Sequence, residues 1–171
     1  MLSSRTTDPA LVRRTCIAGL LAAAAVLLSG ISIPVGPTKC FPFQHAVNAI
    51  AGVLLGPWWA AGAAVVTSVV RNITGTGTLF AFPGSIPGAL VVGFAYRFLR
   101  KDWAALLEPL GTGPVGATLS ALLLGPALGM APGFTALQSA FLASSIPGAI
   151  IGYAVLRILR RTIRGEDPAK N

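Results

Sequence analysis

Charged side chains are scarce in this chain, and acidic side chains are the scarcest. Five of its 171 residues are Asp or Glu, and residues of either charge make up 11% of the sequence. Soluble domains carry about 25% charged residues. A chain of this length cannot hide from water the apolar surface that a hydrophobic fraction of 54% implies. The composition therefore excludes an ordinary soluble domain and indicates an integral membrane protein.

Groups for catalysis, metal binding and nucleotide hydrolysis are also few. The chain has one His and two Cys, and a Cys40–His45 pair has no acidic residue nearby in the sequence to orient it. A metal site needs more ligands than these two residues. The Gly-Thr-Gly segment at 75–77 is too short for a phosphate loop, and no G-x-x-x-x-G-K-[ST] motif occurs. We therefore expect that this chain is not an enzyme, binds no metal or cofactor, and does not hydrolyse ATP.

The positions of the acidic residues argue against a self-sufficient carrier. All of them lie in the termini or in the stretch after segment 84–98, namely Asp8, Asp102, Glu108, Glu166 and Asp167. Proton- and sodium-coupled carriers often use carboxylates buried in the membrane. We expect no such carboxylate here, although carbonyl oxygens alone can also build a sodium site.

Six apolar segments have the character of membrane helices, which need about 20 mostly apolar residues. They lie at 16–33, 44–56, 58–71, 84–98, about 115–129 and 135–158. The second and third share one apolar run, broken at Gly56-Pro57, where proline lacks an N–H and disfavours helix in the residue before it. One long kinked helix, giving five spans, is the alternative. We predict an all-α integral membrane protein with six transmembrane helices.

Basic residues form three clusters that flank these segments. The clusters contain Arg5, Arg13 and Arg14, then Arg97, Arg100 and Lys101, and finally Arg157, Arg160, Arg161 and Arg164. Six spans put all three clusters on one side of the membrane, whereas five spans separate the first from the others. Because positive charge is retained in the cytoplasm, we predict cytoplasmic segments at 1–15 and 161–171 around a membrane domain at 16–160. This distribution indicates a bilayer, not a nucleic acid, as the partner of the basic residues.

A short internal repeat connects two of the segments. Ser-Ile-Pro-Gly-Ala occurs at 85–89 and again at 145–149. Ser is a good helix cap and Pro suits the first helical turn, so each copy predicts the start of a helix. Two such helix N-termini would offer free backbone N–H donors to one outer cavity. A favourable helix start that is simply used twice is the alternative.

Polar residues gather at the predicted outer ends of the helices. Those that begin segment 44–56 include two residues four apart, which share a helix face, and others follow segment 58–71 or begin segment 84–98. Polar groups near hydrocarbon need partners, and Phe41, Phe43, Phe80 and Phe82 lie close to them in the sequence. This combination predicts a pocket for a small, flat, partly polar molecule, although each residue alone could cap a helix or face the headgroups. The candidate binding residues are Lys39, Gln44, His45, Asn48, Arg71, Asn72 and Ser85.

The order of these motifs resembles the ThiW family. The resemblance rests on P-x-G-P-x-K-x-x-P-x-Q-H-x-x-N at 34–48, L-G-P at 55–57, Arg71, and F-P-G-S at 82–85. It covers about residues 33–97, and the rest of the chain matches only in length and layout. ThiW proteins are substrate-capture (S) components of energy-coupling factor (ECF) vitamin transporters. The resemblance implies a multi-pass protein of the cell membrane with six helices, both termini inside and an outer substrate pocket.

The resemblance also implies partners and a substrate. The partners are a transmembrane coupling protein and two cytoplasmic ATPases, which use the ATP, and the substrate class is hydroxyethylthiazole, a thiamin precursor. A neutral thiazole leaves Lys39 and Arg71 less explained; they either serve the loop fold or bind an anionic form of the substrate. An S component for another small heterocycle or vitamin, and a self-sufficient secondary carrier, are the alternative functions.

Small residues on the first helix are expected to contact the coupling protein, as in the family. Ala18 and Ala22 are four apart and let another helix approach closely. Gly19 and Ala23 have the same spacing. Because alanine runs continuously over 22–25, the sequence does not fix which side of the helix faces the partner.

Overall fold

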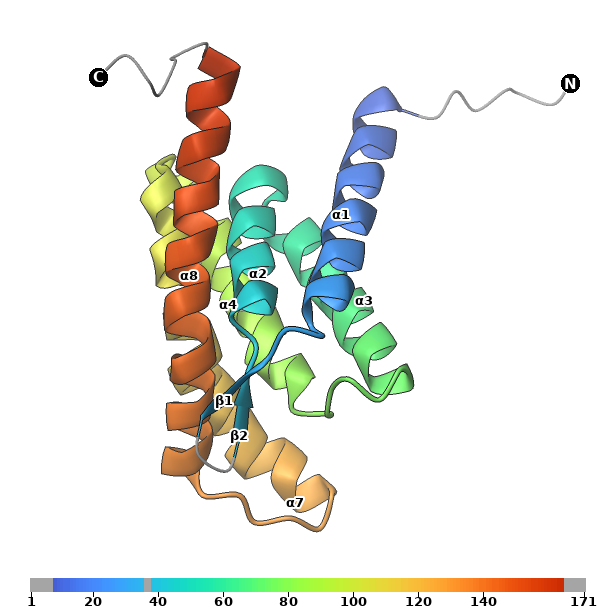
Figure 1. Cartoon of the computed structure of the whole chain (residues 1–171), viewed down its shortest axis with the longest axis vertical. Coiled ribbons are helices and arrows are strands. Elements are labelled where there is room, and N and C mark those ends of the chain that lie inside the picture. Colours follow the sequence, from blue (N-terminus) through green and yellow to red (C-terminus); the bar gives the residue numbers. More distant parts are fainter. Residues whose placement is uncertain (1–7, 36–37, 165–171) are drawn as a thin grey trace, which may run out of the picture.

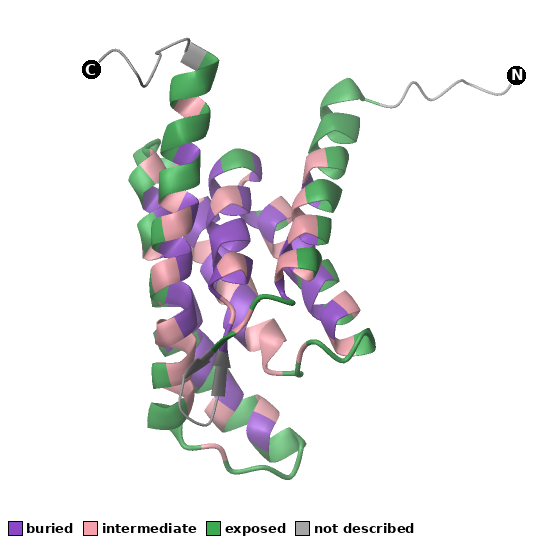
Figure 2. Ribbon diagram, viewed as in Figure 1, coloured by how far each residue is buried: buried purple, intermediate pink, exposed green. Residues whose placement is uncertain are grey.

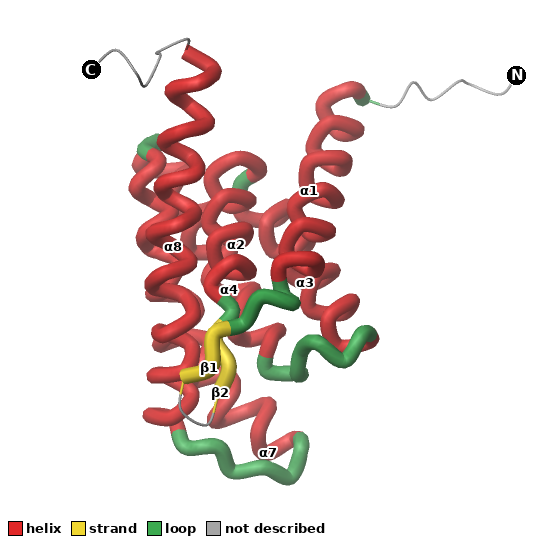
Figure 3. Tube along the Cα trace, in the orientation of Figure 1, coloured by secondary structure: helices red, strands yellow, loops and turns green. Residues whose placement is uncertain are grey.

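The computed structural model describes residues 8–35 and 38–164, which form a bundle of six helical rods (Figures 1 and 3). The rods run alternately up and down, in chain order α1 (Pro9–Leu28), α2 (Pro42–Leu55), α3 (Pro57–Ile73), α4 (Ala81–Leu99), a composite fifth rod and α8 (Phe134–Arg164). The predicted all-α class is confirmed, with one addition. A two-stranded antiparallel ribbon, β1 (Ile33–Val35) and β2 (Thr38–Cys40), lies between α1 and α2.

The predicted break between the second and third segments is confirmed. Gly56 lies between α2 and α3 with a φ of 84°, and Pro57 is the first residue of α3. Glycine adopts positive φ readily, and the missing N–H of proline costs nothing in a first helical turn. The alternative of one long kinked helix is therefore wrong.

The fifth rod begins well before the predicted start near Val115. It consists of η1 (Asp102–Leu107), α5 (Glu108–Leu110), η2 (Gly111–Gly116), α6 (Ala117–Leu119), η3 (Ser120–Leu124) and α7 (Gly125–Ala127), of which η2 and η3 are π-helical. Arg100 has a φ of 53° and ends α4, so the chain reverses there and returns into the bundle at once. Glu108 is consequently buried inside the bundle, and the expectation that no acidic residue would lie there is wrong.

The repeated Ser-Ile-Pro-Gly-Ala segments do not begin helices. One copy lies inside α4 and the other inside α8, each of which starts several residues earlier. The apolar residues before each copy continue the helix despite the prolines at 87 and 147. The prediction of two helix N-termini at these segments is therefore wrong.

The interior of the bundle is built from small residues around α2, which packs against all the other rods. In Figure 2 the inward sides of the helices are buried, and their outward sides are exposed. Close approach depends on glycine: a Cβ on Gly52 of α2 would lie 2.6 Å from Val92 Cγ1 of α4. Three rods are long and apolar enough to cross a membrane, at Pro9–Leu28, Asp102–Ala127 and Phe134–Ile163.

The two ends of the bundle differ. The described part of α1 begins, and α8 ends, at one end, whereas the β-ribbon and the α3–α4 loop lie at the other (Figure 1). The polar residues at the start of α2 and the end of α3 therefore meet at the ribbon end.

Candidate substrate site

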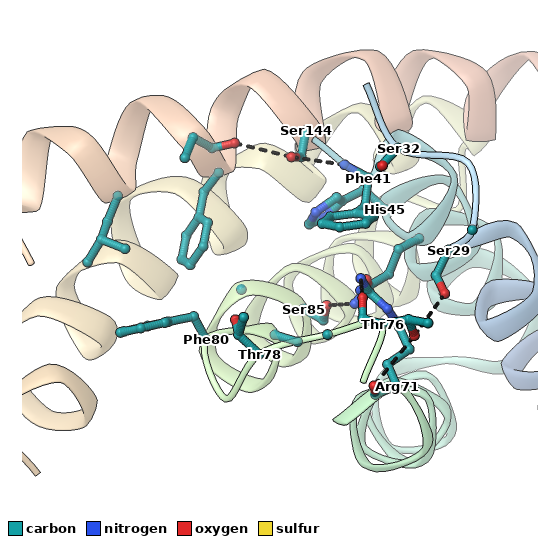
Figure 4. Close-up of a pocket in the computed structure, with 18 of the residues that line it drawn as sticks. Ser29, Ser32, Phe41, His45, Arg71, Thr76, Thr78, Phe80, Ser85 and Ser144 are labelled. Atoms are coloured by element: carbon teal, nitrogen blue, oxygen red, sulfur yellow. Dashed lines mark hydrogen bonds between the residues drawn. The ribbon is translucent and has the colours of Figure 1, made fainter. Parts of the chain in front are cut away.

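A cavity of about 670 Å³ opens at the ribbon end of the bundle. Its walls come from the end of α1, the start of α2, the end of α3 with its following loop, the start of α4, and α8 (Figure 4). Three aromatic residues, Phe41, Phe80 and Phe141, are part of the lining. The cavity is thus a site with both polar and aromatic walls, built from five separate parts of the chain.

Two of the predicted residues, Gln44 and Asn48, come from one face of α2 and contact α4. Gln44 Nε2 donates a hydrogen bond to Ser85 Oγ, and Asn48 Nδ2 donates to the Ser85 carbonyl at 3.4 Å. Gln44, His45 and Ser85 line the cavity, and all are buried. Asn48 is buried but does not line the cavity. Its hydrogen bond to the Ser85 carbonyl therefore holds the α4 backbone in place beside the cavity.

Arg71 reaches the cavity from the end of α3. It is only 2% exposed, and its guanidinium lies 4.3 Å from the centroid of the Phe41 ring. The terminal nitrogen Nη2 donates to the Thr76 carbonyl at 2.9 Å, while the buried Nε has no partner among the described residues. The guanidinium thus stabilises the start of the α3–α4 loop through Thr76, and it retains an unused hydrogen-bond donor at the cavity wall.

The two remaining predicted residues lie elsewhere. Asn72 donates from Nδ2 to the carbonyls of Ser68 and Thr78, at 2.8 and 3.0 Å, so it holds the α3–α4 loop and does not line the cavity. Lys39 belongs to β2, and its side chain lies outside the described residues.

Glu108 is a part of the site that the sequence analysis missed. Its Oε1 lies 2.8 Å from Nδ1 of His45 and accepts a hydrogen bond from Thr112 Oγ1 at 2.7 Å. The expectation that no acidic residue orients His45 is therefore wrong. A usable signal was present in Glu108-Pro109, because proline favours the first turn of a helix and apolar residues follow.

The C-terminal helix α8 contributes further residues that were not predicted. Phe141 lines the cavity, and Ser144 Oγ accepts a hydrogen bond from the Phe41 backbone N–H at 3.3 Å. Of the four predicted aromatics, Phe41 and Phe80 line the cavity, whereas Phe82 faces an apolar groove between α4 and the fifth rod. Because α8 lies far from α2 in the sequence, local motifs carry no signal for these contacts.

Comparison with known families shows to which family the chain belongs. Residues 15–162 match the family described as "Thiamine-precursor transporter protein (ThiW)". The chain belongs to the ThiW family. No match was found among curated proteins.

A solved structure resembles this ThiW chain over almost its whole length. It is the crystal structure of the S-component for biotin from an ECF-type ABC transporter, with a TM-score of 0.63 and 18% sequence identity, covering 94% of this chain and 95% of that chain. At this identity the likeness establishes the fold. ThiW family membership and the S-component fold together identify a membrane transporter component and not an enzyme.

The structure of this ThiW chain also shows which small residues of α1 face the interior of the bundle. Ala18 and Ala22 are buried in a cluster with alanines of α3, among them Ala60 and Ala64. Gly19 and Ala23 lie on the exposed side of α1. The pair chosen for partner docking therefore faces the inside of the bundle, and the alternative pair faces outward.

Proposed function

We propose that this chain captures hydroxyethylthiazole for an ECF-type importer in the cell membrane. Membership in the ThiW family and the S-component fold support a substrate-binding subunit of such a transporter. The observation that carries the choice of ligand is the cavity at the ribbon end, which combines aromatic walls with Gln44, His45 and Ser85. Aromatic side chains pack against a flat ring, and a few placed polar groups fix its orientation.

The proposed topology has six membrane helices with both termini in the cytoplasm. The described basic side chains at the start of α1, the end of α4 and the end of α8 share one end of the bundle. Arg71 is the exception among the cations whose side chains the structure describes. The positive-inside rule supports a cytoplasmic position for the basic end, so the cavity opens to the outside.

Hydroxyethylthiazole is expected to bind the purified chain in detergent, and His45→Ala is expected to weaken binding by about 10- to 100-fold. The variant removes a cavity-lining group and leaves Glu108 without its ring partner, and unmade buried hydrogen bonds cost about 1–3 kcal/mol. Isothermal titration calorimetry measures both constants. Ser120→Ala, which removes a buried hydroxyl with no partner in the described chain, is the matched control and should bind like the parent.

Two results would contradict this proposal. A folded parent chain that binds no hydroxyethylthiazole excludes the ligand, and competition against a panel of vitamins and heterocycles then tests the alternative substrates. A His45→Ala variant that binds like the parent places the ligand elsewhere. Asn48→Ala should have a smaller effect, because Asn48 acts only through its contact with Ser85.

An anionic form of the heterocycle is a second candidate ligand, favoured by Arg71. This cation is buried at the cavity wall, its Nε has no partner in the described part of the chain, and neither of the two ion pairs there, His45–Glu108 and Arg160–Asp102, involves it. Burying an uncompensated charge costs several kcal/mol. A phosphate or carboxylate on the ligand would compensate that charge.

The phosphate ester of hydroxyethylthiazole is expected to bind the parent about tenfold or more tightly than the alcohol if Arg71 anchors an anion. Arg71→Gln keeps part of the packing on Phe41 but removes the charge, so it should abolish this preference. Calorimetry with both ligands on both proteins makes the comparison. An equal loss for the two ligands would show that Arg71 serves the loop through Thr76 instead.

A further inference from the structure

The ring of His45 has two nitrogens in different surroundings. Nδ1 lies 2.8 Å from Oε1 of the fully buried Glu108. Nε2 has no hydrogen-bond partner within the described residues and is not among their buried unpartnered atoms, and the ring lines the cavity (Figure 4). One nitrogen is therefore committed to the protein, and the other remains for a ligand.

The carboxylate of Glu108 is held in place by contacts from two helices. Thr112, one turn further along the fifth rod, donates to the same Oε1 at 2.7 Å. On the α4 side, a Cβ on Gly88 would lie 2.4 Å from both Glu108 Oε1 and Thr112 Oγ1. Only glycine leaves room for the carboxylate here, so the backbone of α4 presses directly on this group.

Gly88 belongs to the first copy of the Ser-Ile-Pro-Gly-Ala repeat, and the second copy holds His45, the other member of the pair. A Cβ on Gly148 of α8 would lie 2.6 Å from His45 Cβ and 2.4 Å from the Pro42 carbonyl oxygen. The α8 backbone therefore packs against α2 at His45. The two equivalent glycines of the Ser-Ile-Pro-Gly-Ala repeat thus lie against the two halves of the His45–Glu108 pair.

We propose that Glu108 is a positioning residue that holds His45 as the Nδ1–H tautomer and presents Nε2 to the ligand as a hydrogen-bond acceptor. An ionised carboxylate only accepts hydrogen bonds, and in a neutral imidazole the nitrogen without a proton is an acceptor. The site therefore selects a ligand with a donor, such as a hydroxyl group, at this position. The identity of the hydroxyl ligand rests on the proposed function, whereas the tautomer does not.

The tautomer can be read without any ligand, because His45 is the only histidine of the chain. Nitrogen-15 NMR of the protein labelled at histidine should show a protonated Nδ1 and a bare Nε2. Glu108→Gln keeps an acceptor oxygen and should keep this spectrum, whereas Glu108→Ala should give a mixture of tautomers. A parent with protonated Nε2, or a spectrum unchanged in Glu108→Ala, would overturn the proposal.

Ligand selectivity provides a readout that a purely structural role does not move. The parent should bind hydroxyethylthiazole about tenfold or more tightly than its methyl ether, which lacks the donor. Glu108→Ala should bring this ratio close to one, and Glu108→Gln should preserve it. An equal weakening of both ligands in Glu108→Ala would reduce Glu108 to a structural residue and overturn the inference.

Gly88→Ala tests the geometry without changing either member of the pair. The added methyl group meets the flexible tip of Glu108 and the hydroxyl of Thr112, so the fold can persist while the carboxylate moves. We expect the same loss of selectivity and the same mixed spectrum as in Glu108→Ala, and parent-like behaviour in the control Ser120→Ala. An unaltered tautomer in folded Gly88→Ala would contradict the proposed positioning. Failure of both ligands to bind the parent would exclude the substrate class, and the spectra would still decide the tautomer.

Discussion

Replacing Gly93 by alanine is expected to destabilise the bundle by about 3 kcal/mol, the upper end of what overpacking of a core usually costs. A Cβ at this position would lie 2.4 Å from both the N and the Cα of Pro57 and 2.9 Å from the Gly56 carbonyl carbon. These are backbone atoms of the turn that joins α2 to α3, so no side-chain rotation relieves the contact. The α4 helix would have to move away from the turn.

Thermal unfolding in detergent, followed by circular dichroism, measures the effect. For a chain of this size, about 3 kcal/mol corresponds to a fall in Tm of roughly 6–12 °C. Gly62→Ala is the matched control, because a Cβ on this exposed glycine of α3 would meet no atom within 4 Å. Alanine is the better helix former, so the control should be as stable as the parent or slightly more stable. Equal stability of the two variants would show that α4 does not pack tightly on the turn.

The same packing determines the site. Gly52 lets α2 approach α4 closely, and Gly93 lets α4 approach the turn after α2. The Gln44–Ser85 and Asn48–Ser85 hydrogen bonds join the same two helices, α2 and α4. A displaced α4 would carry Ser85 away from Gln44. Gly93→Ala is therefore expected to weaken ligand binding as well as stability.

Helix number and the turn at residues 55–57 were predictable because their causes are local. A glycine and a proline end one helix and start the next through their own backbone properties. The start of the fifth rod was not predictable in this way. It begins directly after a basic cluster and contains two π-helical segments, and the left-handed residue Arg100 that turns the chain back into the bundle is not a glycine, so no local residue type marks this start.

The residues of the site also divide into those that a local pattern predicts and those that depend on helix packing. Gln44 and His45 follow from a local pattern at the start of α2, and Ser85 lines the same cavity although it lies inside α4 and does not cap it as predicted. The roles of Glu108 and Ser144 depend on how α2 packs against the fifth rod and α8, and no local spacing encodes that packing. The glycines of the repeat were visible in the sequence, but their function as contact points for the histidine–carboxylate pair was not.

Vesicles that contain this chain alone are expected to show no transport of hydroxyethylthiazole, even down a concentration gradient. The sequence has no nucleotide-binding motif, and the residues that line the described cavity lie at the ribbon end of the bundle. Uptake should appear when the coupling protein, its two ATPases and ATP are added. A radiolabelled ligand measures both cases. Downhill flux by the chain alone would support the alternative of a self-sufficient carrier.

Coupling should depend on the outward face of α1. Ala23→Leu places a large side chain on the exposed side of this helix, where small residues would let a partner helix approach closely. We expect the variant to bind hydroxyethylthiazole like the parent in detergent but to lose most ATP-driven uptake in vesicles with the complete transporter. Ala154→Leu, the same substitution at an exposed alanine of α8, is the control and should transport normally. Full uptake by Ala23→Leu would move the docking surface away from α1, whereas loss of binding would show that the substitution disturbs the bundle itself.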